Sequence, residues 1–285
     1  MIVDFHTHIL PPEFQNLRSE FINTDATFSD LLRNPTAKIA TAEDLIEAMD
    51  RDGVDVSVIM GFGWTDHGVA RASNDYIINS VAKYPTRLRG FAGINPSWGD
   101  IAIDEVERCA DAGLLGIGEM HPDTQQFDLG SSTFMQPLME IVHSLELMVT
   151  THCSEPVGHS YGGKGTVRPE VLWQFIQAFP NATIICAHWG GGLPFYALMP
   201  EVRKSLQNVY FDTAASPFLY DKDVFQVVAS LIGVEQILFA SDYPVLNASR
   251  LIRQLETSGL AQDKRDAIAY GNATRLLKLQ ITHTE

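Results

Sequence analysis

The chain has 285 residues, 45% of them hydrophobic and 19% charged, a composition typical of a folded protein with a large core rather than of a disordered chain. Its formal net charge of −15 disfavours nucleic acid and anionic membranes, because these bind through clustered Lys and Arg. The sequence has no N-terminal signal pattern and no apolar run long enough to span a bilayer. We therefore expect a cytoplasmic protein that binds neither nucleic acid nor membrane.

Three cysteines are present, Cys109, Cys153 and Cys186. Their number is odd and their spacing is not that of a metal site, which suits reduced thiols in a cytoplasm. We expect small, buried core residues at these positions.

Short runs rich in β-branched and apolar residues recur at intervals that leave room for a helix between them. They predict strands at residues 2–5, 54–60, 88–94, 114–119, 147–152, 183–188, 208–212 and 236–240. The intervening segments have helical spacing. One of them begins at Thr41, which is a good capping residue, and has an acidic residue, Asp44, in its first turn.

Alternation of strands and helices predicts the fold class. Continuous apolar runs such as residues 183–187 and 237–240 indicate strands buried on both faces, as in a parallel sheet covered by helices. With about eight such units we expect residues 1–285 to form a single (β/α)₈ barrel domain. The competing doubly wound open sheet usually has a glycine-rich turn after its first strand, where this chain has His6-Thr-His8.

Two stretches are longer than a minimal barrel needs, residues 10–40 and 153–167. Both are expected to rise from the carboxyl end of the barrel, where such loops cover or select a substrate. Surface loops without a role are the alternative for each stretch.

The first strand carries a pair of histidines. His6 and His8 are two residues apart, and alternate strand residues face the same side, so both imidazoles point to one place. Two imidazoles held in this way form half of a zinc-type site. Asp4 shares their face and could orient a ligand ring; a buried carboxylate paired at the barrel floor is the alternative.

Polar residues also fall at the ends of four later strands: Glu119, His152, His188 and Asp242. In a barrel all of these strand ends open into one mouth. A lone His or Asp at a strand end usually satisfies backbone groups. Their joint placement instead predicts a metal site that uses the His6 and His8 pair.

These motifs resemble the amidohydrolase superfamily, and within it the branch of aminocarboxymuconate-semialdehyde decarboxylase-like proteins. The matching segments are residues 4–8 (Asp-Phe-His-Thr-His), His152, residues 188–191 (His-Trp-Gly-Gly) and residues 241–244 (Ser-Asp-Tyr-Pro). They occur in the family order and span most of the chain.

The resemblance implies roles for individual residues. His6, His8, His152 and Asp242 would bind a divalent metal, usually zinc, and Asp242 would also transfer a proton. His188 matches a histidine that contacts water and polarises the substrate. A bound cation can lower the pKa of its water to about 7, and a carboxylate beside it is suited to proton transfer.

Glu119 leaves two interpretations open. In two-metal branches of the superfamily the fourth strand carries a bridging ligand, so Glu119 could bind a second ion; otherwise it accepts a hydrogen bond from a ligand histidine. His121 lies on the same predicted face and could assist either role. The sequence therefore predicts one ion, with two as the alternative.

Candidate substrate-binding residues lie in residues 155–168, which include His159, Tyr161, Lys164 and Arg168. Such groups can hold a carboxylate or carbonyl by charge-assisted hydrogen bonds, although solvated surface charge explains Lys164 and Arg168 equally well. Three aromatic residues, Phe62, Trp64 and Trp189, could line the pocket or pack in the core. Three further histidines, His67, His143 and His283, have no comparable context.

The function expected from these residues is metal-dependent hydrolysis of an amide, lactone or related bond in a small, carboxylated substrate. Non-oxidative decarboxylation is the alternative, because it uses the same ligands; Glu119 favours the first reaction and the family resemblance the second. A non-catalytic metal-binding or ligand-binding barrel is less consistent with the presence of Asp242 and His188. The resemblance also implies a homodimer.

Overall fold

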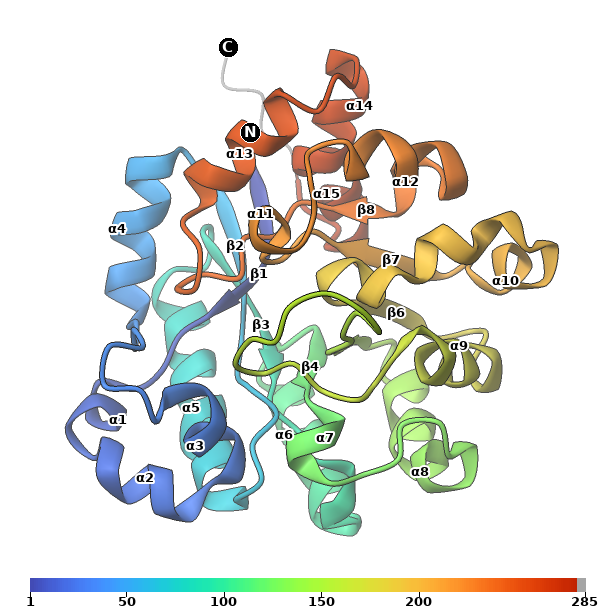
Figure 1. Ribbon diagram of the computed structural model, residues 1–285. Helices are drawn as coiled ribbons and strands as arrows, with labels where there is room; N and C mark the ends of the chain where they lie inside the picture. Colours follow the sequence, from blue (N-terminus) through green and yellow to red (C-terminus); the bar gives the residue numbers. More distant parts are fainter. Residues whose placement is uncertain (281–285) are drawn as a thin grey trace.

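The computed structural model describes residues 1–280, in which eight parallel strands form one sheet in the order β1 to β8 (Figure 1). Beyond β8 the chain continues beside β1: the amide of Phe5 donates to the carbonyl of Phe239, and that of His8 to Tyr243. These bonds close the barrel. The strands are β1 (Val3–His8), β2 (Val56–Met60), β3 (Leu88–Ala92), β4 (Gly116–Met120), β5 (Met148–Thr151), β6 (Thr183–Cys186), β7 (Val209–Asp212) and β8 (Ile237–Leu238).

Helices surround this barrel (Figure 1). Among residues 1–280, no helix has both the length and the apolar composition needed to cross a membrane. The larger helices are α4 (Ala42–Asp52), α5 (His67–Lys83), α6 (Asp100–Asp111), α8 (Ser132–Ser144), α9 (Pro169–Ala178), α12 (Val224–Ile232) and α13 (Ala248–Glu256). The shorter ones are α1 (Pro12–Asn16), α2 (Arg18–Thr24), α3 (Ala26–Leu32), α7 (Pro122–Gln125), α10 (Pro200–Ser205), α11 (Ser216–Leu219), α14 (Gln262–Asp266) and α15 (Asn272–Leu276).

The predicted barrel is confirmed and the open doubly wound sheet is excluded, because the chain directly after β8 is hydrogen-bonded to β1. All eight predicted strands are present with bounds that differ by a few residues. Helix α4 begins as predicted: the hydroxyl of Thr41 accepts from the amide of Asp44, whose carboxylate accepts from the amide of Thr41. The three cysteines are buried and free, and His283 lies outside the described residues.

The core has two layers. Inside the barrel, apolar residues of the strands fill the space below the mouth, and the rings of Phe5 and Phe91 pack edge to face with centroids 6.0 Å apart. A larger cluster lies between the strands and the surrounding helices. Both faces of the sheet are therefore buried, as is typical of a parallel barrel covered by helices.

Residues 10–40 form the short helices α1, α2 and α3 rather than an irregular loop. They cover an aromatic cluster in which Phe14 and Phe28 pack against Trp64, with ring centroids 6.2 and 6.1 Å from it. Trp64 is fully buried, so it anchors this segment instead of lining a pocket. Trp189 is also buried, with its ring against Phe225.

Close packing of the strands generates a prediction at Gly116 in β4. A Cβ atom there would lie 2.7 Å from the carbonyl oxygen of Met148 and 2.8 Å from the ring of Phe91. We expect Gly116→Ala to lower the free energy of unfolding by about 1–3 kcal/mol, the usual cost of overpacking, measured by urea denaturation.

Gly271 supplies the matched control. It has helical angles (φ −58°, ψ −45°), and a Cβ there would meet nothing closer than 3.6 Å. Gly271→Ala should leave stability unchanged or raise it by up to about 1 kcal/mol. Equal losses in both variants would contradict this account of the barrel packing.

Candidate active site

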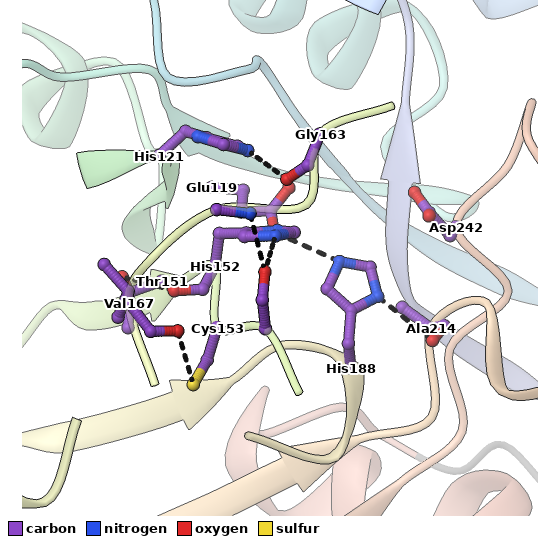
Figure 2. Close-up of polar contacts among 12 residues, drawn as sticks. Glu119, His121, Thr151, His152, Cys153, Gly163, Val167, His188, Ala214 and Asp242 are labelled. Atoms are coloured by element: carbon purple, nitrogen blue, oxygen red, sulfur yellow. Dashed lines mark hydrogen bonds and ion pairs between the residues drawn. The ribbon is translucent and has the colours of Figure 1, made fainter. Parts of the chain in front are cut away.

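Six polar residues from five strands meet at the carboxyl end of the barrel. They come from β1, from β4, and from the segments that follow β5, β6 and β8. Each is buried, with at most 8% of its surface exposed. Figure 2 shows the side chains of Glu119, His152 and His188 turned toward one another at the centre of the site. The six residues are His6, His8, Glu119, His152, His188 and Asp242.

The two β1 histidines face each other through their Nε2 atoms, which are 3.0 Å apart. The Nδ1 atom of His6 lies 2.8 Å from a carboxylate oxygen of Asp212, and that of His8 lies 3.2 Å from the carbonyl oxygen of Met60. Both partners only accept hydrogen bonds, so each Nδ1 carries the proton. In neutral rings the two Nε2 lone pairs then converge, an arrangement that a cation between them stabilises.

Glu119 lies at the centre of four imidazole rings. Its Oε2 is 3.5 Å from Nε2 of His6 and 3.7 Å from Nε2 of His8. Its Oε1 is 2.9 Å from Nδ1 of His152 and 3.4 Å from Nε2 of His188. Each carboxylate oxygen therefore faces its own pair of histidines.

Burial and charge compete at this centre. Burial alone would raise the pKa of Glu119, but the nearby His6, His152 and His188 hold it well below its ordinary value. Burial lowers the pKa of His188, and the carboxylates of Glu119 and Asp242 reverse that effect and raise it to about 9. The site thus favours charged carboxylates and a bound positive charge.

Two of the six residues have an unusual backbone conformation. His188 has φ 56° and Asp242 has φ 68°, in the left-handed region that side chains other than glycine seldom occupy. Such strain persists where the surrounding structure over-determines it, often at functional sites. Here the amide of His188 donates to Asp212 and that of Asp242 to the carbonyl of His6.

The donor atoms suit a divalent cation. Two groups of three residues, His6–His8–Glu119 and Glu119–His152–His188, have ligand atoms within 4.8 Å of one another. Asp242 lies beside the first group, with Oδ1 3.4 Å from Nε2 of His8 and 3.9 Å from that of His6. Mixed imidazole and carboxylate sets bind zinc, manganese and related ions.

Asp212 is a residue of the site that the sequence interpretation missed. Its Oδ2 accepts from Nδ1 of His6 at 2.8 Å, and its Oδ1 accepts from the amides of His188 and Ala214 at 2.9 and 3.0 Å. It fixes the His6 ring in the way predicted for Asp4. Its position at the end of the seventh predicted strand was the available signal.

Asp4 is a buried, paired carboxylate, but its partner is Ser241 in the segment after β8 and not a residue of the barrel floor. Its carboxylate accepts from the amide of Ser241 at 2.8 Å and from the Ser241 hydroxyl at 2.5 Å, and it contacts the backbone rather than the ring of His6. Burial raises the pKa of Asp4 to about 7, against the lowering effect of the Ser241 bonds. Asp4 therefore joins β1 to the segment after β8.

A cavity of about 430 Å³ opens above the six residues, a volume in the range of small-molecule sites. The polar end holds His8, Glu119, His152, His188 and Asp242, and the walls are largely apolar. Phe62 stacks on the ring of His8 with a centroid distance of 4.0 Å. The apolar side chains of the wall are Leu31, Phe62, Ala215, Phe218, Leu219 and Val245.

The predicted substrate residues fall into two groups. His159 and Tyr161 line the cavity, whereas Lys164 and Arg168 do not. The ammonium of Lys164 donates to the carbonyls of Val157 and His159, and Arg168 is the exposed residue before α9. Substrate binding by Lys164 or Arg168 has no support from the cavity, and binding by the other two stays a prediction.

His121 belongs to the wall of the site. Its ring stacks on His152 with centroids 4.3 Å apart, and its Nε2 lies 3.1 Å from the carbonyl oxygen of Gly163. Burial lowers the pKa of His121 to about 4, so its ring is neutral. It supports His152 by packing.

Residues 153–167 are held over the cavity by Asp123 of α7. Its carboxylate accepts hydrogen bonds from the amides of Thr166 at 2.8 Å and Val167 at 3.4 Å, and from the Thr166 hydroxyl. Gly165 lies so close that a Cβ atom there would be 2.0 Å from Asp123 Oδ2. The loop is therefore fixed at its carboxyl end.

A metal-binding cluster at the carboxyl end of a parallel barrel defines a class of metal-dependent barrel enzymes. The family profile described as amidohydrolase matches residues 3–279. The chain belongs to this family.

Two relatives are decarboxylases. The chain is 26% identical to gamma-resorcylate decarboxylase of Polaromonas sp. (strain JS666), over 74% of this chain and 76% of the relative. It is 21% identical to 2-amino-3-carboxymuconate-6-semialdehyde decarboxylase of Dictyostelium discoideum, over 97% of this chain and 91% of that protein.

Solved structures agree on the fold. 5-Carboxyvanillate decarboxylase from Sphingomonas paucimobilis superposes with a TM-score of 0.80 at 18% identity and covers 98% of this chain and 99% of its own. Dihydroxybenzoic acid decarboxylase from Polaromonas sp. JS666 was solved with bound manganese and the inhibitor 2-nitroresorcinol. It superposes with a TM-score of 0.72 at 19% sequence identity and covers 99% of this chain and 98% of its own.

The expectation that hydrolysis takes precedence over decarboxylation is wrong. The relatives matched along most of the chain are decarboxylases, which favours the alternative reaction. The preference for hydrolysis rested on Glu119 as a bridging ligand. A ligand set alone does not fix the reaction, because the same donors serve either chemistry. Zinc in particular stays a prediction; the similar barrel from Polaromonas sp. JS666 holds manganese.

The contact between Gly165 and Asp123 generates a prediction for the loop. We expect Gly165→Ala to displace the Asp123 carboxylate and break its bonds to the Thr166 and Val167 amides. Hydrogen exchange at residues 164–167 should then rise at least tenfold, measured by mass spectrometry.

Gly162 is the matched control in the same loop, because a Cβ atom there would meet nothing within 4 Å. Gly162→Ala should leave exchange at residues 164–167 unchanged. Unaltered exchange in Gly165→Ala would show that Asp123 does not hold the loop.

Proposed function

We propose that this protein is a metal-dependent, non-oxidative decarboxylase of a small acid with one ring or an equivalent conjugated chain. The observation that carries the proposal is the similarity, over most of the chain, to decarboxylases of resorcylate and aminocarboxymuconate semialdehyde. The cavity supports it, since its apolar walls suit a flat carbon skeleton and its polar end suits a carboxylate.

In this proposal His6, His8, Glu119 and Asp242 hold the ion, with His152 and His188 across the carboxylate of Glu119. When bound, a divalent cation supplies positive charge that orients and polarises the oxygen atoms of the substrate. Zinc and manganese both suit this donor set.

Proton transfer is assigned to a side chain that lines the cavity. Decarboxylation breaks the bond between the carboxyl carbon and its neighbour; the electron pair stays on the neighbouring carbon, which takes up a proton, and carbon dioxide leaves. Glu119 and Asp242 are the carboxylates among the cavity-lining residues of the described chain. Because Glu119 is engaged by imidazoles at both oxygens, we assign the proton transfer to Asp242, whose carboxylate takes a proton from water and passes it to that carbon.

The apolar wall contributes by excluding water. Phe62, Phe218 and Val245 surround the space above the polar end, which strengthens charge interactions there and holds the substrate in one orientation. His159 and Tyr161 lie at the loop side of the cavity, and we propose that they contact the ring substituents.

The direct test is product analysis on a panel of hydroxybenzoic and muconate-like acids with added manganese or zinc. In heavy water we expect carbon dioxide and a product with one deuterium at the carbon that lost it. Asp242→Asn should reduce the rate at least 100-fold, the range for loss of a general acid. A product that incorporates oxygen from labelled water without release of carbon dioxide would contradict the proposal.

A second prediction concerns ion affinity. Asp212→Asn replaces the carboxylate oxygen that accepts from Nδ1 of His6 by an amide NH₂ group, which donates. The His6 ring would then carry its proton on Nε2, the atom that would bind the ion. We expect manganese affinity to fall about 10–100-fold, measured by calorimetry on the metal-depleted protein. Asp4 is the control, because its buried carboxylate does not contact the ring of His6. Asp4→Asn should change manganese affinity less than threefold. Equal losses of affinity in the two variants would contradict the role assigned to Asp212.

A further inference from the structure

We propose that the cavity accepts acids with a single carboxylate and rejects acids with two, and that Glu155 is the residue that determines this choice. The inference rests on the proposed function and narrows it, because it names the class of acid that binds. The relatives leave this point open, since gamma-resorcylate carries one carboxylate and 5-carboxyvanillate carries two.

The first argument is the charge of the cavity wall. Among the described residues that line the cavity there is neither lysine nor arginine. One carboxylate can lie at the polar end, where the histidines and a bound ion face it. A second carboxylate would be taken out of water without a cation to pair with, which is costly. His159 lines the loop side, but it is exposed, and water there weakens its attraction for an anion.

The lysine of the loop after β5 is already engaged. The ammonium of Lys164 donates to the carbonyls of Val157 and His159 at 3.0 and 2.9 Å. It lies 5.5 Å from the centroid of the Tyr161 ring but does not line the cavity. Turning this ammonium toward a substrate would break both hydrogen bonds, so Lys164 is not poised to pair with a second carboxylate.

A negative charge lies next to the loop side of the cavity. Tyr161 lines the cavity, and its hydroxyl donates to Oε2 of Glu155 at 2.9 Å. Oε1 of Glu155 is buried and has no hydrogen-bond partner within residues 1–280. Burial and the neighbouring charge of Glu155 raise the pKa of Tyr161 and that of Tyr220, so both phenols stay neutral. The charge of Glu155 is therefore separated from the cavity by one aromatic side chain.

Glu155 acts on a bound acid in two ways. Its charge repels a second carboxylate on the loop side, and the largely apolar walls strengthen that repulsion because they exclude water. It also takes the hydroxyl proton of Tyr161, so the phenol oxygen can only accept further hydrogen bonds. A hydroxyl or amino substituent can donate to that oxygen, whereas a carboxylate cannot. We therefore expect neutral, hydrogen-bond-donating substituents on this side.

Binding measurements test the inference without requiring turnover. The protein is saturated with manganese and titrated by calorimetry with 2-hydroxybenzoate and with 2-hydroxybenzene-1,4-dicarboxylate. We expect the monocarboxylate to bind about 30-fold more tightly or better, because like charges repel in a site that excludes water. The control is 2-hydroxy-4-nitrobenzoate, whose nitro group has the shape of a carboxylate without its net charge. It should bind within about threefold of 2-hydroxybenzoate if charge decides rather than size.

Variants of Glu155 separate its charge from its hydrogen bond. Glu155→Gln keeps an oxygen that accepts from Tyr161 and removes the charge, so the preference for the monocarboxylate should fall about tenfold. Glu155→Asp keeps the charge and should keep the preference. Glu170→Gln is the matched control, because it removes the same charge from the exposed first turn of α9; it should leave the preference unchanged.

Equal or tighter binding of the dicarboxylate by the wild type would overturn the inference, and so would an unchanged preference in Glu155→Gln. The wild-type comparison tests the inference even if a variant fails to fold. Preference for the dicarboxylate with release of carbon dioxide would refute only this inference. Preference for the monocarboxylate without release of carbon dioxide from any acid would refute only the proposed function, and binding of neither acid would refute both.

Discussion

A carboxylate buried among four imidazole rings is the constraint on which the rest of the site depends. Glu119 has 5% of its surface exposed and lies within 3.7 Å of a nitrogen of each ring. A charge buried in this way is tolerated only if positive charge and hydrogen bonds compensate it. The rings are therefore held in defined orientations by partners outside the cluster: Asp212 for His6, Met60 for His8, Ala214 for His188 and Ser154 for His152.

The barrel makes this arrangement possible because it separates stability from chemistry. Apolar residues of the strands pack below the mouth, and helices cover the outer face, so the strand ends are free to carry polar groups. The cost appears locally, in the left-handed backbone of His188 and Asp242. Asp212 reduces that cost by accepting from the amide of His188 with one oxygen while it orients His6 with the other.

The sequence was sufficient for the barrel and for the six residues at its mouth, because strand periodicity and position at a strand end are local properties. It was insufficient where the decisive contact joins distant segments. Asp4 and Asp212 both lie on strands and both are acidic, yet only Asp212 is hydrogen-bonded to the ring of His6, whereas Asp4 is engaged by Ser241. Likewise Lys164 and Arg168 had the right charge for an anionic substrate, but the path of their loop directs them away from the cavity.

The same limit explains why the residues of the site did not identify the reaction. Ligand histidines and an acidic proton carrier are needed both to activate water and to protonate a carbon, so they do not distinguish the two reactions. The difference lies in what the rest of the cavity excludes and orients. Here the wall is largely apolar, and the ring of Phe62 stacks on that of His8. The side chains that carry this information come from α3, α11 and the loops after β2, β5 and β8, segments without a periodic pattern, and only the folded chain brings them together.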